Sequence, residues 1–208
     1  IQTNGLVPDA VTYNSILYAF AKIKRVDDVE KIRMHMKQIG CKSDEITYNT
    51  MISMYGKLGL HDKALSLYRE MEGEGCHPDA VTFTVLIDAL GKAERIEEAE
   101  NIFQEMADLH ITPTLQGFSA MINAYVKVQK FTEAQCSYEC MIETGIIPDN
   151  LIFSLMLDVL KKVNLPEKGL QMYQRAVKRG FIPELHVYRF LLSWLSDKGL
   201  WKEIEVVN

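Results

Sequence analysis

The chain has 208 residues, with 28 acidic against 23 basic side chains, a formal net charge of −5 and 48% hydrophobic residues. This apolar share and the two tryptophans exclude a disordered chain, and no apolar run approaches the ~20 residues of a membrane span. Four cysteines are too few for a disulfide framework at this length, so we expect reduced thiols in a reducing compartment.

The sequence repeats itself every 35 residues without insertion. An aromatic residue recurs at this period, as Tyr13, Tyr48, Phe83, Phe118, Phe153 and Tyr188. Such a period indicates a solenoid of stacked repeats. We expect one continuous domain: the tail of a preceding repeat at 1–9, complete repeats at 10–44, 45–79, 80–114, 115–149 and 150–184, and a truncated repeat at 185–208. We also expect the chain to be a piece of a longer protein that carries any targeting segment.

Each repeat is expected to form two short helices. In the first repeat, apolar residues at helical spacing predict helix A over 13–22 and helix B over 27–38. The same pattern predicts helix A at 48–57, 83–92, 118–127, 153–162 and 188–197, and helix B at 62–73, 97–108, 132–143 and 167–178. No stretch alternates apolar and polar residues over its whole length, so the expected fold class is all-α.

Prolines mark the repeat boundaries, and we expect them to stop helix B and to set the turn into the next helix A. They are Pro8, Pro78, Pro113, Pro148 and Pro183. The residue that closes each repeat is acidic or carries a hydroxyl: Asp9, Asp44, Asp79, Thr114, Asp149 and Glu184. Two interpretations of these residues stay open, a helix N-cap and a ligand-facing side chain. A methionine column in helix B is expected in the core: Met36, Met71, Met106 and Met141.

Three columns of helix A are not explained by packing. One is a lysine at the end of each complete helix A: Lys22, Lys57, Lys92, Lys127 and Lys162. The second follows the aromatic residue: Asn14, Asn49, Thr84, Ser119, Ser154 and Arg189. The third lies three residues before the second: Val11, Ile46, Val81, Gln116, Leu151 and His186. Their spacing places all three on one side of helix A. Each repeat thus offers an apolar spot, a small hydrogen-bonding group and a cation, which suits one base and one phosphate.

The charge is divided between the two kinds of helix. The six helix A windows hold seven basic and three acidic residues, whereas the five helix B windows hold fifteen acidic and eight basic residues. The negative net charge therefore conceals a basic stripe along helix A, which is the electrostatic signature of a phosphate-binding surface.

These features resemble the pentatricopeptide repeat family with its P-type 35-residue repeats, over almost the whole chain. The resemblance rests on the period, on Thr-Tyr-Asn at 12–14 and 47–49, on the Ala-x-x-hydrophobic-aromatic-x-x-Met pattern of helix B and on the closing Pro-Asp. It implies a right-handed α-α superhelix of antiparallel helix pairs that binds single-stranded RNA, at about one base per repeat. It also implies a role in organellar RNA metabolism (stability, splicing, editing or translation of a transcript) in the chloroplast or mitochondrion, without a cofactor.

The resemblance assigns base selection to the residue after the aromatic together with the residue that closes the repeat. Asn14 with Asp44 and Asn49 with Asp79 would read uridine, Ser119 with Asp149 guanosine, and Thr84 with Thr114 and Ser154 with Glu184 a purine. The expected site is 5′-UURGR-3′. Base clamping falls to Val11, Ile46, Val81, Gln116 and Leu151, and phosphate binding to Lys22, Lys57, Lys92, Lys127 and Lys162. Gln116 departs from the aliphatic pattern, and the last repeat departs further with Arg189 and Asp197.

The sequence also bears on two other function classes. The acidic net charge favours a protein-binding scaffold of the related tetratricopeptide type, or a structural component of a large ribonucleoprotein; proteins of an RNA-processing complex would then be partners. An enzyme is not expected, because the histidines are scattered without a nucleophile or metal partner: His35, His61, His77, His110 and His186. Cys136 and Cys140 share a helix face but lack further ligands, so no metal site is expected.

Overall fold

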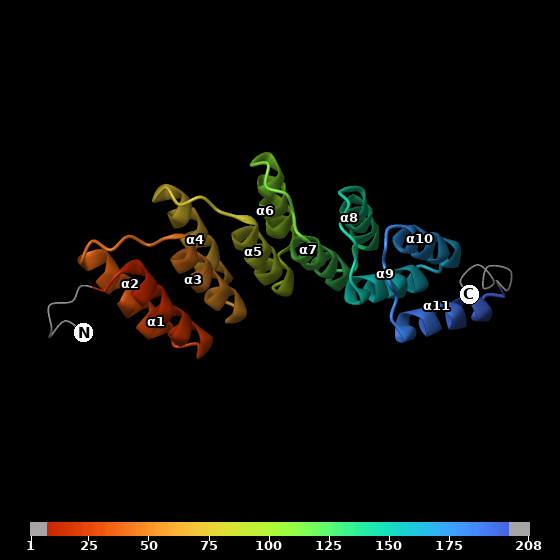
Figure 1. Ribbon diagram of the computed structural model, residues 1–208, viewed down its shortest axis with the longest axis horizontal. Coiled ribbons are helices and arrows are strands. Elements are labelled where there is room, and N and C mark those ends of the chain that lie inside the picture. The colour runs from red at the N-terminus through yellow and green to blue at the C-terminus, as the bar shows by residue number, and fades with distance from the viewer. Residues whose placement is uncertain (1–7, 200–208) are drawn as a thin grey trace. The chain divides into compact units, whose positions relative to one another are not determined.

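The computed structural model describes residues 8–199, and the regular elements in this range are all α-helices of 13 residues (Figure 1). They are α1 (Ala10–Lys22), α2 (Val26–Gln38), α3 (Glu45–Lys57), α4 (His61–Gly73), α5 (Ala80–Lys92), α6 (Ile96–Asp108), α7 (Leu115–Lys127), α8 (Phe131–Glu143), α9 (Asn150–Lys162), α10 (Pro166–Lys178) and α11 (Leu185–Asp197). The expected repeat tail and the end of the truncated repeat fall at 1–7 and 200–208, outside the described residues.

The helices group into two compact units, with the division of the chain between Pro113 and Thr114, and each unit is described by itself. In unit 1, α1 packs on α2, α3 on α4 and α5 on α6, while the A helices α1, α3 and α5 lie side by side. In unit 2, α7 packs on α8 and α9 on α10, and α11 contacts both α9 and α10. Three residues join α1 to α2, so the chain turns back on itself within a repeat. Helix pairs are therefore the building block of both units.

Each A helix begins three residues earlier than the sequence predicted. The prediction placed the start at the aromatic residue, whereas α1 begins at Ala10 and α3 at Glu45. The reason is the closing residue of the preceding repeat: the Asp9 carboxylate accepts a hydrogen bond from the Thr12 backbone nitrogen at 2.9 Å and lets the helix start directly after it. The clamp column consequently lies in the first turn of each A helix.

The expectation that proline stops helix B was wrong. After α4 the chain adopts a left-handed conformation at Gly75, where φ is +77°. The Gly75 nitrogen then donates to the Glu72 carbonyl at 3.0 Å, and the Cys76 nitrogen donates to the Met71 carbonyl at 3.0 Å. These two bonds satisfy the last carbonyl groups of the helix and end it. Pro78 comes only after this turn, in the segment that leads to α5.

Two of the repeating columns form the core. The aromatic column is buried, with exposed fractions of at most 5% for Tyr13, Tyr48, Phe83, Phe118 and Phe153. The methionine column is fully buried, as expected: Met36, Met71, Met106 and Met141. Burying one such side chain stabilises the fold by about 1.5–3 kcal/mol. The 35-residue period therefore reflects the recurrence of buried core residues.

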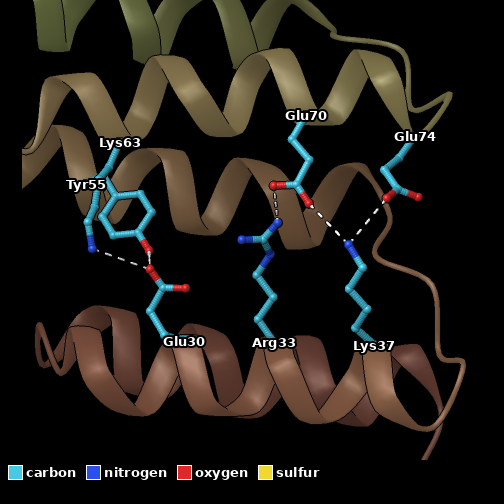
Figure 2. A network of polar contacts seen from close by, with 7 residues as sticks. All are labelled: Glu30, Arg33, Lys37, Tyr55, Lys63, Glu70 and Glu74. Atoms are coloured by element: carbon cyan, nitrogen blue, oxygen red, sulfur yellow. Dashed lines mark hydrogen bonds and ion pairs between the residues drawn. The ribbon is translucent and has the colours of Figure 1, made fainter.

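Charged side chains join the B helices of the first two repeats (Figure 2). Glu30 on α2 accepts a hydrogen bond from the Tyr55 hydroxyl and lies 3.6 Å from Lys63 on α4. Burial and the Glu30 carboxylate raise the pKa of Tyr55, so its hydroxyl remains the donor. Further along, Arg33 and Lys37 of α2 form ion pairs with Glu70 of α4 and with Glu74, the residue directly after α4. The acidic surplus of helix B is thus used partly in contacts between repeats.

No helix within residues 8–199 combines the length and apolar character needed to cross a membrane.

Candidate nucleic-acid interface

Asp44 is the last residue of the first repeat and directly precedes α3. Its carboxylate accepts a hydrogen bond from the Thr47 backbone nitrogen at 2.8 Å, and its own backbone nitrogen donates to the Thr47 hydroxyl at 3.3 Å. This reciprocal pair is a capping box, which satisfies two backbone groups that the first turn leaves free. Asp44 is therefore an N-cap.

The same carboxylate also contacts the first selecting residue, Asn14 on α1. The Asn14 Nδ2 atom lies 3.0 Å from both carboxylate oxygens of Asp44. On its other side, the Asn14 Oδ1 atom accepts a hydrogen bond from the Thr47 hydroxyl at 2.5 Å. The predicted pair is thus brought together, and a third residue from the next repeat completes it. The N-cap interpretation of Asp44 is confirmed, whereas the ligand-facing interpretation stays a prediction, because the contacts of this carboxylate are to Thr47 and Asn14.

The second selecting pair is built in the same way. The Asn49 Nδ2 atom donates to the Asp79 Oδ1 atom at 3.4 Å, and the Thr82 hydroxyl donates to the Asn49 Oδ1 atom at 2.7 Å. Asp79 caps α5 by accepting from the Thr82 backbone nitrogen at 2.9 Å. Thr82, like Thr47, is fully buried, whereas the contact between Asn49 and Asp79 is exposed to solvent.

Hydrogen bonding keeps both aspartates ionised. Burial by itself raises the pKa of Asp44, but donation from the Thr47 backbone nitrogen and from Asn14 lowers it more, so the net pKa lies below the usual value for an aspartate. At Asp79 burial is likewise outweighed, by donation from Thr82 and Asn49, and the pKa is again lowered. Each pair therefore carries a negative charge on its aspartate, and the carboxylate oxygens already accept hydrogen bonds from the protein.

The second pair lies in an open groove of about 520 Å³ on the A helices of unit 1. Asn49 and Asp79 line it together with the clamp residues Ile46 and Val81, and Lys57 borders it. Tyr18, Lys22 and Lys24 also line it. The groove thus joins members of all three columns that packing did not explain: an apolar wall, a hydrogen-bonding pair and cations. This combination can hold a flat, polar, negatively charged ligand.

The clamp column is exposed although most of it is aliphatic. The exposed fractions are 71% for Val11, 63% for Ile46, 56% for Val81 and 72% for Leu151, and Gln116 is exposed as well. Solvent contact for an aliphatic side chain at the same position of successive repeats is unusual without a binding role. The expectation that this column faces a ligand therefore fits its exposure.

The lysine column stands at the last residue of each A helix from α1 to α9, and all five side chains are exposed. Lys92 forms an ion pair with Asp88 at 2.5 Å. The Lys162 ammonium lies 5.8 Å from the centre of the Phe131 ring. Since all five occupy the negative end of a helix, each also complements the helix dipole.

The selecting pairs of unit 2 are built differently. Asp149 caps α9 by accepting from the Ile152 nitrogen at 2.8 Å, and within the described part of unit 2 no hydrogen bond joins it to Ser119. Thr114 caps α7 through its hydroxyl, which accepts from the Gly117 nitrogen at 3.3 Å. Its predicted partner Thr84 belongs to unit 1, so this pair stays a prediction; the Thr84 hydroxyl donates to the Ala80 carbonyl at 2.7 Å.

The last selecting pair is connected through a histidine. The Ser154 hydroxyl donates to the Asn150 carbonyl at 2.7 Å and lies 3.4 Å from His186 Nε2. The other ring nitrogen of His186 lies 3.3 Å from the Glu184 carboxylate. Glu184 makes no side-chain cap to α11; instead its backbone nitrogen donates to the Asn150 side chain at 2.8 Å. His186 stands in the clamp register of the following repeat, so that position is polar there, as it is at Gln116.

Sequence reasoning missed the threonines Thr47 and Thr82. Thr47 entered the sequence analysis only as a letter of the Thr-Tyr-Asn pattern, and Thr82 did not enter it. The period itself marks both, since Thr12, Thr47 and Thr82 recur at 35 residues. In residues 8–199 no group of three or more His, Cys, Asp or Glu side chains could hold a metal ion, and the four cysteines are free thiols.

Models of known protein families match these repeats. The model described as "PPR repeat family" matches residues 8–57, 43–92 and 81–125, and the model described as "PPR repeat" matches 118–146 and 151–181. None of the curated protein sequences matches the chain.

Several solved structures share the fold. The pentatricopeptide repeat protein PPR10 from maize aligns with 98% of this chain at a TM-score of 0.67 and 23% identity, and PPR10 in complex with an 18-nt psaJ RNA element aligns with 99% at 0.69 and 22%. The PPR domain of Arabidopsis thaliana PRORP1 in complex with tRNA aligns with 90% at 0.74 and 14%. The chain spans 29% and 31% of the two PPR10 chains and 98% of the PRORP1 domain. The predicted all-α helical-repeat solenoid is confirmed; its right-handed sense stays a prediction.

Proposed function

The chain belongs to the pentatricopeptide repeat family, and from this premise we propose that it binds single-stranded RNA in a sequence-specific way, with about one base per repeat. The observation that carries the proposal is the groove on the A helices of unit 1. There an exposed aliphatic wall, the Asn49–Asp79 pair and Lys57 line one open space. A nucleotide has a flat base with a hydrogen-bonding edge and a charged phosphate, so it complements all three parts.

Two further facts support this function. The structures with the same fold include PPR10 bound to an RNA element and a PRORP1 domain bound to tRNA. The lysines recur once per repeat at exposed helix ends, where they supply the sequence-independent contacts that phosphates require. A peptide-binding scaffold would need neither the lysine at each A helix nor a small polar side chain after each aromatic residue.

We assign the letters of the bound RNA from the selecting pairs. Asn14 with Asp44 and Asn49 with Asp79 are assigned to uridine, Ser119 with Asp149 to guanosine, and the other two pairs to a purine, which gives 5′-UURGR-3′. The aliphatic residues Val11, Ile46, Val81 and Leu151 are proposed to hold the bases, and the five lysines the phosphates. The protein acts by binding and not by catalysis in this proposal. We place it in organellar RNA metabolism, in the chloroplast or mitochondrion, because of its family.

A binding titration tests the proposal. Fluorescently labelled 5′-UUAGA-3′ and 5′-AAAGA-3′, each within the same flanking sequence, are titrated with the chain, and the first RNA is annealed to its complement as a control. We expect the single-stranded UUAGA to bind at least tenfold more tightly than AAAGA, since each mismatched base costs roughly 1–3 kcal/mol, and the duplex to bind weakly. Equal affinity for the two single strands would refute sequence-specific reading. Absence of binding to any RNA would refute the function and favour the protein-binding scaffold.

A further inference from the structure

The threonines of the next repeat take part in base selection. We propose that Thr47 and Thr82 are positioning residues that hold the Asn14 and Asn49 amides in one orientation, and that this orientation selects uracil against cytosine. The proposal rests on the RNA-binding function above and adds to it a third side chain per base, supplied across the repeat boundary. The selecting unit at the first two letters is then Asn–Asp–Thr and not a pair.

The contacts on either side of each amide are opposite in kind. The Asn14 Nδ2 atom faces the Asp44 carboxylate at 3.0 Å, while the Oδ1 atom faces the Thr47 hydroxyl at 2.5 Å. A hydroxyl has one proton to donate, and the Thr47 hydroxyl also lies 2.8 Å from the Asp44 carboxylate. The contact with the amide is the shorter of the two, which favours donation to Asn14.

The second pair repeats this preference. The Thr82 hydroxyl lies 2.7 Å from the Asn49 Oδ1 atom and 3.0 Å from the Asp79 Oδ1 atom, so the contact with the amide is again the shorter. Rotating either amide by half a turn would place its oxygen against a carboxylate and its NH₂ group against a hydroxyl that donates. The amide oxygen would then meet the carboxylate, acceptor against acceptor, and the threonine hydroxyl would have to turn its proton from the amide to the aspartate, so both present contacts would be lost. The threonine and the aspartate together therefore fix the direction of the amide.

A fixed amide leaves a defined hydrogen-bonding edge. Of its two N–H groups and two oxygen lone pairs, one N–H is used by the aspartate and one lone pair by the threonine. One donor and one acceptor remain, in a fixed order. Uracil offers a donor at N3 beside an acceptor at O4, whereas cytosine offers an acceptor at N3 beside an amino donor. With the base held in place by the clamp residues, an amide that fits uracil must turn over to fit cytosine.

The sequence itself couples the threonine to the asparagine. Thirty-three residues after Asn14 and Asn49 stand Thr47 and Thr82. Three selecting residues carry a hydroxyl in place of an amide, and the residue 33 positions after each of them has no hydroxyl. These pairs are Thr84 and Gly117, Ser119 and Ile152, and Ser154 and Val187. Helix capping alone does not explain this difference, because Asp149 caps α9 in front of Ile152 without a threonine. A threonine is present where there is an amide to orient.

The test compares three variants of the whole chain. Thr47→Val removes the hydroxyl and keeps the shape, and Thr47→Ser restores the hydroxyl. Thr12→Val is the matched control: the Thr12 hydroxyl contacts the carboxylate of the N-cap residue Asp9 at 2.6 Å, as the Thr47 hydroxyl contacts that of Asp44, but it meets no amide among the described residues. Each protein is titrated with 5′-UUAGA-3′ and 5′-CUAGA-3′ in identical flanks. The ¹⁵N relaxation of the Asn14 side-chain amide is measured without RNA.

We expect Thr47→Val to reduce the preference for U over C at the first letter by about three- to tenfold, and to increase the mobility of the Asn14 amide. Thr47→Ser and Thr12→Val should behave as wild type in both measurements. If Thr47→Val weakens binding to the two RNAs by the same factor, Thr47 is only a capping residue and the inference is refuted, while the proposed function stands. A wild-type protein that binds neither RNA would instead refute the function, and the inference about base selection with it.

Discussion

The selecting residues of unit 1 and unit 2 stand at the same register of the same helices, yet their surroundings differ. In unit 1, Asn14 and Asn49 are each held between an aspartate and a threonine. In unit 2, the Ser154 hydroxyl donates to the carbonyl one turn earlier in its own helix, and Ser119 has no hydrogen bond to Asp149 within the described residues of that unit. A repeat can therefore keep its backbone and change what it offers to a ligand.

The difference has a physical consequence for recognition. An amide held by two neighbours is preorganised, so binding a base costs little further ordering. A serine that donates to its own helix keeps only acceptor lone pairs for a ligand, and it leaves more room for a large base. We therefore expect Asn14 and Asn49 of unit 1 to read pyrimidines with high discrimination. Thr84 of unit 1, whose hydroxyl also donates to its own helix, and the serines of unit 2 should accept purines with less.

The largest effect should come from the packing that brings the A helices of unit 1 together. A Cβ atom on Gly56 would lie 2.8 Å from the Ala89 Cβ atom, whereas the equivalent position of unit 2 is Val126. The Ala89 methyl group cannot rotate away from this contact, so a larger side chain at position 56 would push the backbones of α3 and α5 apart. Gly56→Val should therefore destabilise the fold by about 1–3 kcal/mol. Urea denaturation followed by circular dichroism measures this.

Gly73→Ala is the control for that variant. No atom lies within 4 Å of a Cβ built on Gly73, at the end of α4, so alanine should stabilise the protein by about 0.5 kcal/mol through its better helix propensity. If Gly56→Val has the stability of wild type, the A helices do not approach as closely as described.

The second prediction converts a selecting unit of unit 1 into that of unit 2. Asn49→Ser with Thr82→Ile, and with Asp79 unchanged, reproduces the Ser119–Asp149–Ile152 combination. A serine leaves room for a purine and keeps one hydrogen bond, so the second letter should change from U to G, with a swing of about tenfold or more. Titration of both proteins with 5′-UUAGA-3′ and 5′-UGAGA-3′ measures the swing.

The single variant Asn49→Ser should also shift the preference toward G, but less completely, because the Thr82 hydroxyl loses its amide partner. The letters on either side should be unaffected in both variants. An unchanged ratio between the two RNAs would mean that Asn49 is only a residue of the first helical turn.

The sequence predicted the fold and the columns well, because both follow from the period. A buried aromatic and a buried methionine every 35 residues identify the core directly, and the lysine register marks the end of each A helix. What the period could not give is the hydrogen bonding between repeats. Thr47 lies 33 residues from Asn14 along the chain, and only the packing of α1 against α3 brings their side chains to 2.5 Å. The histidine link between Ser154 and Glu184 was hidden for the same reason.

The third prediction compares the contribution of the two units to binding of the RNA phosphates. Lys57→Ala removes a cation that lines the groove of unit 1, and Lys162→Ala removes its counterpart in unit 2. Each change should flatten the slope of log K against log salt by about 0.7, the value for one phosphate contact on a single strand. Both should weaken binding to all sequences alike.

Lys31→Ala, on the exposed side of α2, is the control and should leave the slope unchanged. A slope that changes for Lys57→Ala but not for Lys162→Ala would show that unit 2 does not contact the phosphates through this column.

The smallest effect concerns the charge of the helix caps: Asp44 caps α3 in unit 1, whereas in unit 2 the first cap, Thr114, is uncharged and the second, Asp149, is charged. Burial raises the pKa of Asp44, but its hydrogen bonds from Thr47 and Asn14 lower it to a net value below 3.8. The ionised form therefore stabilises the folded protein above pH 3.8, and this contribution is lost as the pH falls through the folded-state pKa.

Asp44→Asn keeps an N-cap and an acceptor for Asn14 but removes the charge. Near pH 7 it should cost about 0.3–1 kcal/mol, the usual contribution of an anion at a helix N-terminus. The difference in unfolding free energy between variant and wild type should shrink as the pH falls below 3.8, because protonated aspartate then resembles asparagine. Thr114→Asn, which exchanges one uncharged cap for another, should show a difference that does not change with pH. Urea denaturation between pH 7 and pH 3 measures both. A constant difference for Asp44→Asn across this range would mean that the carboxylate is not held in its charged form by Asn14 and Thr47, and the preorganisation attributed to unit 1 would lose its electrostatic basis.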